Sequence, residues 1–140
     1  MNSTDSASKV PISFWVVAGL GVLWNGFAVV AFWLTATHDQ QTMAQTPPEM
    51  ALALTQTPTW AIAAWGLAVV AALVGSLLLV FRRKLAVPAF VVSLAGLLVL
   101  TIYQFASNMP MSLLQVVMIW FVALFLLRFS NSEASKGLLR

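Results

Sequence analysis

The sequence contains no cysteine, and charged residues make up only 8% of its 140 residues. Without cysteine the chain has no disulfide, no thiolate nucleophile and no cysteine-ligated zinc or iron–sulfur centre. A soluble domain carries about 25% charged residues, whereas 61% of this chain is hydrophobic. The composition therefore indicates an integral membrane protein.

Acidic residues are also few, since four Asp and Glu stand against seven Lys and Arg, for a net charge of +3. Nucleic-acid surfaces typically carry a stripe of basic residues interleaved with aromatic side chains, and the basic residues of this chain do not form one. We therefore expect membrane lipids as partners, together with a second copy of the chain or another membrane protein, and no nucleic acid.

Four long apolar segments predict four membrane-spanning helices, because about 20 such residues cross a bilayer. The predicted spans cover residues 12–37, 58–81, 85–106 and 111–129. The first is too long for the apolar region of a signal peptide, so we expect it to stay uncleaved. Polar segments separate the spans: a tail at 1–11, a loop at 38–57, turns at 82–84 and 107–110, and a tail at 130–140.

The basic residues lie on only one side of this scheme, at Lys9, Arg82, Arg83, Lys84, Arg128, Lys136 and Arg140. Cytoplasmic segments of membrane proteins carry an excess of Lys and Arg. The pattern predicts an antiparallel four-helix bundle with both termini in the cytoplasm and the 38–57 and 107–110 segments outside. Arg82, Arg83 and Lys84 would fix this topology and could also contact lipid headgroups.

The long external loop contains a helix-start signal. Thr46 and Glu49 have the spacing of a capping box, and Pro47 suits the first helical position. We expect a short helix from here to about Gln56.

Small side chains recur every four residues in the second span, at Ala64, Ala68, Ala72 and Ser76. Such spacing lets another helix approach closely in a membrane. These residues are the predicted helix-packing positions, and the second span is the predicted packing centre.

The sequence resembles small four-span bacterial inner-membrane proteins of unknown function, some of them labelled sugar transporters. The resemblance covers nearly the whole chain and is carried by Phe14-Trp15, Ala18-Gly19, Leu23-Trp24-Asn25, Pro58 with Trp60, Leu77 to Lys84, Ala86-Val87-Pro88, Phe90 and Tyr103. It implies the same architecture in a bacterial inner (cytoplasmic) membrane. It supplies no catalytic or binding residues.

No ionisable residue lies well inside a predicted span, so the candidates for chemistry are neutral. Asn25 either joins helices or contacts a ligand. The other ligand candidates are Trp65, Tyr103, Gln104 and Gln115. They would form either an external-facing aromatic and amide pocket, or an interfacial aromatic belt with one structural pair of glutamines.

His38, Asp39 and Glu49 are the only cluster with metal-ligand chemistry, but their spacing fits no zinc motif and indicates a solvated loop. We expect no metal, cofactor or catalytic residue, and therefore not an enzyme. The first functional hypothesis is a non-catalytic helical bundle with an accessory, assembly or lipid-interacting role. The alternative is an oligomeric carrier or binder of a neutral small solute, lipid or quinone.

Overall fold

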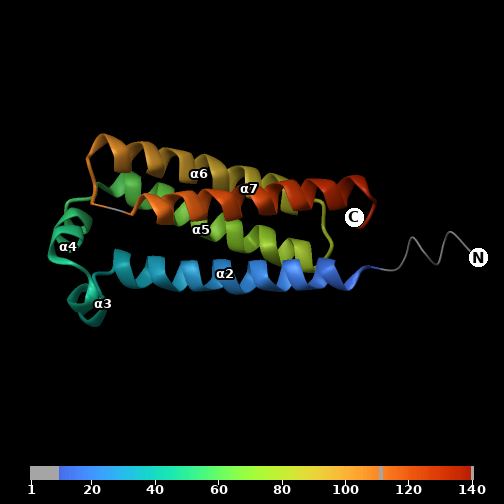
Figure 1. Ribbon diagram of the computed structural model, residues 1–140, viewed down its shortest axis with the longest axis horizontal. Coiled ribbons are helices and arrows are strands. Elements are labelled where there is room, and N and C mark those ends of the chain that lie inside the picture. Colours follow the sequence, from blue (N-terminus) through green and yellow to red (C-terminus); the bar gives the residue numbers. More distant parts are fainter. Residues whose placement is uncertain (1–9, 111, 140) are drawn as a thin grey trace, which may run out of the picture.

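A computed structural model describes residues 10–110 and 112–139 of the chain. Within these ranges the fold is all-helical, in the order α2 (Ile12–Ala36), α3 (Gln40–Gln45), α4 (Pro48–Thr55), α5 (Thr59–Val80), α6 (Ala86–Ala106) and α7 (Leu113–Ser135) (Figure 1). The long helices α2, α5, α6 and α7 are each long and apolar enough to cross a membrane. The prediction of an all-helical fold with four long apolar helices that could span a membrane is confirmed. Lys9, Met111 and Arg140 lie outside the described residues.

All four long helices end in the same type of turn. In each one, two successive amides after the helix bond back to carbonyls of its last turn, which is the Schellman arrangement. The motif needs a residue with positive φ, a conformation that glycine adopts most easily. Only α7 uses glycine there; the four residues are His38 (φ 55°), Arg82 (φ 58°), Asn108 (φ 54°) and Gly137 (φ 80°).

Helix α5 lies between α2 and α6 and packs extensively against both, whereas α7 packs mainly against α6. The closest approach is between α5 and α6. A Cβ atom at Gly96 would lie 2.8 Å from the carbonyl oxygen of Ala64 and 3.0 Å from the amide nitrogen of Ala68. Only glycine therefore fits at residue 96 without moving the backbone of α5.

A single apolar cluster joins all four long helices near the start of α2. It contains Phe14 and Ala18 of α2, Leu79 of α5, Ala86 and Phe90 of α6, Leu126 of α7, and Leu139 beyond α7. The ring of Phe90 lies against Gly75, where an added Cβ would be 3.0 Å from it. This end of the molecule therefore holds the best-defined core of the described residues.

The 38–57 segment folds into two short helices at the opposite end (Figure 1). Helix α4 lies within the predicted range, but α3 was not predicted. The capping-box interpretation is wrong, because Thr46 donates instead to the carbonyl of Thr42 (2.7 Å) and α4 has no side-chain cap. Asp39 caps α3 by accepting from the amide of Thr42 (3.1 Å).

Helix α7 continues to Ser135, beyond the predicted span end at 129. The amides of Gly137 and Leu138 terminate it by bonding to the carbonyls of Ala134 and Glu133. The signal for this longer helix is Gly137, since glycine commonly follows the last helical turn.

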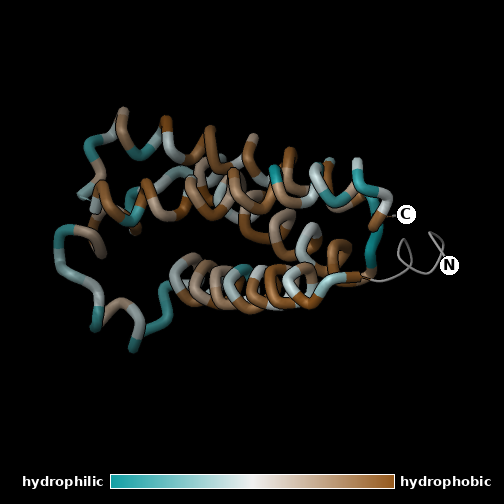
Figure 2. Tube along the Cα trace, turned by 45° about the vertical axis from the view of Figure 1, so that its right-hand side comes forward, coloured by the Kyte–Doolittle hydropathy of each residue, from teal (hydrophilic) through white to brown (hydrophobic). Residues whose placement is uncertain are grey.

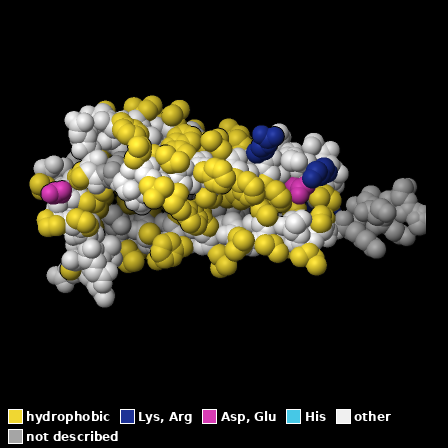
Figure 3. Space-filling view, viewed as in Figure 1, with side chains coloured by type: hydrophobic (Ala, Val, Ile, Leu, Met, Phe, Trp, Pro, Cys, Tyr) yellow, Lys and Arg dark blue, Asp and Glu magenta, His cyan; other side chains and the backbone are white. Residues whose placement is uncertain are grey.

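The surface combines an apolar middle with polar ends. Hydropathy is highest along the long helices and lowest in the connecting segments and around the end of α7 (Figure 2). Large apolar side chains of all four long helices are exposed, among them Phe27, Leu67, Ile102 and Phe121. On the face in Figure 3, Lys and Arg side chains appear only towards the end at which α7 finishes. We call the end of the molecule that carries Arg82, Arg83, Lys84, Arg128 and Lys136 the basic end.

Candidate functional site

Asn25 is a residue of α2 that is only 6% exposed, and its side chain lies between α2 and α5. Its Nδ2 atom donates to the Ser76 Oγ of α5 and to the Gly21 carbonyl, both at 2.9 Å. Ser76 in turn donates to the carbonyl of Ala72 (3.0 Å). Both Asn25 amide hydrogens therefore have acceptors within the protein, and the side chain joins two spans.

Helices α5 and α6 have a polar contact of the same kind. The buried Ser93 hydroxyl donates to the carbonyl of Ala68 (2.6 Å). Of the four predicted packing residues, Ala64 and Ala68 lie against Gly96 of α6, and Ser76 lies against Gly21 and Asn25 of α2. These small residues thus contact other helices of the same chain.

Helices α6 and α7 are joined by Thr101 and Trp120. The indole Nε1 of Trp120 donates to the Thr101 hydroxyl (3.0 Å), which itself donates to the carbonyl of Leu97 (2.7 Å). Each pair of neighbouring spans along α2, α5, α6 and α7 therefore shares at least one polar hydrogen bond. Trp120 and Thr101 were not among the predicted candidates, because neither residue type is unusual in a span.

The five predicted ligand-binding residues do not share one site in the described structure, although Tyr103 and Gln104 are adjacent in α6. Asn25 bonds to Ser76, which is only four residues before the end of α5 and about 6 Å from it along the helix. Gln104 is near the end of α6, at the opposite side of the molecule. Trp65 packs edge-to-face on Phe32 (5.0 Å between ring centroids), and Tyr103 does so on Trp60 (5.3 Å). Gln115 is exposed.

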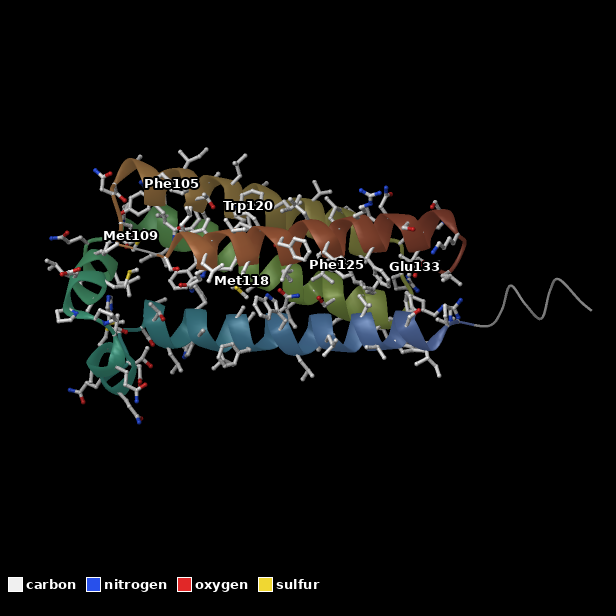
Figure 4. The ribbon with its side chains drawn as sticks, in the orientation of Figure 1. Phe105, Met109, Met118, Trp120, Phe125 and Glu133 are labelled. Atoms are coloured by element: carbon white, nitrogen blue, oxygen red, sulfur yellow. The ribbon has the colours of Figure 1, made fainter. Side chains whose placement is uncertain are left out.

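Two recesses lie near these residues. Trp65 borders one of about 10 Å³ together with Thr35, His38 and Leu54, and about 10–15 Å³ is needed for a single water. The second holds about 250 Å³ and is lined by Gln104, Phe105, Asn108, Met109, Leu113 and Val116. Figure 4 labels Phe105 and Met109 at this end of the molecule. Among the predicted residues, only Gln104 lines this larger recess.

His38, Asp39 and Glu49 serve the loop structure at this end. His38 occupies the positive-φ position after α2, Asp39 caps α3, and Glu49 lies in the first turn of α4. Among residues 10–110 and 112–139, no group of three His, Asp or Glu could hold a metal ion.

The three basic residues between α5 and α6 differ in their exposure. Arg83 and Lys84 are exposed, whereas Arg82 is half-buried. The Nε of Arg82 donates to the carbonyl of Leu138 (2.9 Å), beyond the end of α7. The charges of Arg83 and Lys84 are thus free to face water or lipid headgroups.

Glu133 was also missed, since its position in the predicted polar tail indicated a solvated side chain. It is only 5% exposed, close to the end of α7 (Figure 4). Its Oε2 lies 3.4 Å from the Nζ of Lys136 and has no hydrogen-bond partner among the described residues. A carboxylate near the C-terminal end of a helix also faces the negative end of the helix dipole.

We therefore expect Glu133→Gln to raise the free energy of unfolding by about 1 kcal/mol, because it removes a poorly paired buried charge. Lys136 is exposed and stays solvated after the change. Denaturant titration in mixed micelles measures the difference. Glu49 is exposed and lies at the favourable end of the α4 helix dipole, so Glu49→Gln is the contrast and should not raise stability. A loss of stability would mean that the Glu133 carboxylate makes a favourable interaction that this account omits.

The polar side chains buried between the spans thus form three separate contacts between helices and not one convergent site. Comparisons with protein-family models, curated proteins and solved structures found no match to this chain.

Proposed function

We propose that this chain is a non-catalytic integral membrane protein that presents helix surfaces to partners or lipids in an accessory or assembly role. One observation carries the proposal. The polar side chains between neighbouring spans are bonded to each other or to backbone carbonyls: Asn25 to Ser76, Ser93 to Ala68, and Trp120 to Thr101. Such bonds stabilise helix association in membranes. They leave these groups little capacity to bind a solute.

The outer surface is the part of the chain that remains for contacts with other molecules. Helix α7 is the least buried of the four long helices, since only 11% of its most apolar stretch of 18 residues is buried. Its exposed side chains include Leu114, Val117, Phe121 and Leu124. The small residues of α5 are already used within the chain. A partner helix or lipid would therefore contact mainly α7.

We further propose that the basic end faces the cytoplasm of a bacterial inner membrane. Arg82, Arg83, Lys84, Arg128 and Lys136 lie in the turn after α5 and in the last part of α7, whereas Asp39 and Glu49 lie at the other end. The excess of Lys and Arg in cytoplasmic segments supports this orientation, and the resemblance described above supports the type of membrane. Single cysteines introduced at Glu49 and Ser135 test it by labelling with an impermeant maleimide in intact cells.

The functional proposal is tested by mild detergent extraction followed by native mass spectrometry. We expect a stoichiometric membrane-protein partner, a second copy, or retained lipid. Phe121→Ala with Leu124→Ala should weaken that association, while Leu98→Ala with Ile102→Ala on exposed positions of α6 should not. Lipid-free monomers with no partner under all extraction conditions would contradict the proposal.

A binder of a neutral solute remains the second candidate, and the recess around Gln104 and Asn108 favours it. Two carboxamides beside the apolar side chains of Phe105 and Leu113 could orient a small polar molecule. Gln104→Leu should then abolish binding or uptake in proteoliposomes without loss of folded protein. Unchanged binding or uptake would exclude this site.

A further inference from the structure

The chain turns back on itself after α7. Gly137 adopts a φ of 80°, and the following Leu138 and Leu139 return towards the helices. Leu139 is only 2% exposed and belongs to the apolar cluster that includes Phe14, Leu79, Phe90 and Leu126. One leucine beyond the last span thus packs in a core to which all four long helices contribute.

Arg82 holds this segment from the turn between α5 and α6. Its Nε donates to the Leu138 carbonyl at 2.9 Å, across 56 residues of sequence. A guanidinium gives a stronger hydrogen bond than a neutral donor. The contact therefore fixes the backbone next to Leu139.

The backbone conformation of Arg82 is unusual for a residue with a side chain. With a φ of 58°, Arg82 has the left-handed backbone conformation that glycine usually supplies after a helix. A side chain with a Cβ atom is disfavoured there. The turn itself gains nothing from arginine, and Arg83 and Lys84 already supply exposed positive charge. The bond to the Leu138 carbonyl distinguishes the half-buried Arg82 side chain from the exposed Arg83 and Lys84.

We propose that Arg82 and the segment Gly137–Leu139 form a latch that closes the basic end of the molecule over the apolar cluster. With the latch closed, Leu139 shields Phe14, Leu79 and Phe90 from water at the membrane surface. Release of the Arg82 bond would expose that cluster while the spans stay packed further along. The latch does not depend on the proposed function.

The absence of cysteine makes the latch measurable. A single Leu139→Cys probe should react slowly with a water-soluble maleimide, compared with Asn131→Cys on the exposed side of α7. Adding Arg82→Gly relieves the positive-φ conformation of the turn but removes the hydrogen bond to the Leu138 carbonyl. We expect it to speed labelling of Leu139→Cys about ten-fold or more, and to leave labelling of Asn131→Cys unchanged.

His38→Gly is the matched control, because it relieves the same backbone conformation at the other end of the molecule. It should leave the labelling of Leu139→Cys unchanged. Since a cysteine at 139 could itself loosen the segment, hydrogen–deuterium exchange of the Leu138 amide is measured in chains that keep Leu139. Its exchange should speed up in Arg82→Gly. Rapid labelling with Arg82 present, or no effect of Arg82→Gly on both readouts, would overturn the latch.

Discussion

Gly96→Ala is expected to destabilise the folded chain by about 1–3 kcal/mol, because a well-packed interface has no room for an added methyl group. The new Cβ would lie 2.8 Å from the Ala64 carbonyl oxygen, and backbone atoms of a packed helix cannot swing aside as a flexible side chain does. Helices α5 and α6 would have to separate, which also weakens the bond from Ser93 to Ala68. Denaturant titration in mixed micelles measures the change in the free energy of unfolding.

The same substitution at Gly19 and Gly26 provides matched controls. Both are in α2, and an added Cβ at either position has no neighbour within 4 Å. Alanine favours helix over glycine by about 1 kcal/mol, so these variants should be neutral or more stable. Equal losses at Gly96 and Gly26 would mean that close approach of α5 and α6 is not the cause.

Phe90→Ala is expected to cost about 3 kcal/mol, since it leaves a cavity where the four long helices meet. The Phe90 side chain is 2% exposed and fills the space over Gly75 of α5. The smaller side chain would remove contacts with several elements at once, and Gly75 cannot fill the gap. The same titration measures the loss, together with the amount of folded protein recovered.

Phe105→Ala is the control on the same helix, because that side chain is 56% exposed. It should change the free energy of unfolding by less than about 0.5 kcal/mol. If Phe105→Ala proved as harmful as Phe90→Ala, the apolar cluster at the basic end would not be the main core of the chain.

The four long helices could be predicted because a long apolar segment with almost no charge is recognised without any information about the residues that pack against it. Helix-terminal details were harder. Thr46 and Glu49 have capping-box spacing, yet Thr46 bonds backwards to Thr42 because α3 precedes it. Short polar helices such as α3 have little apolar periodicity, so the sequence carries a weak signal for them.

The partners of the polar residues could not be predicted, since they depend on helix rotation and depth. The small-residue spacing of α5 indicated close packing, but not that Ala64 and Ala68 meet Gly96. Asn25 was assigned either to helix joining or to a ligand, and the structure pairs it with Ser76. Glu133 and Leu139 looked like tail residues, because nothing in a linear pattern reveals the return of the chain after Gly137.

The central claim is that polar side chains inside the spans join helices to each other. A double-mutant cycle of Asn25→Ala and Ser76→Ala in bilayers tests it most directly. The account predicts a favourable coupling energy of about 0.6 kcal/mol, the average found for hydrogen bonds between membrane helices, and of at most about 1.7 kcal/mol. Strictly additive effects, with a coupling energy of zero, would contradict it.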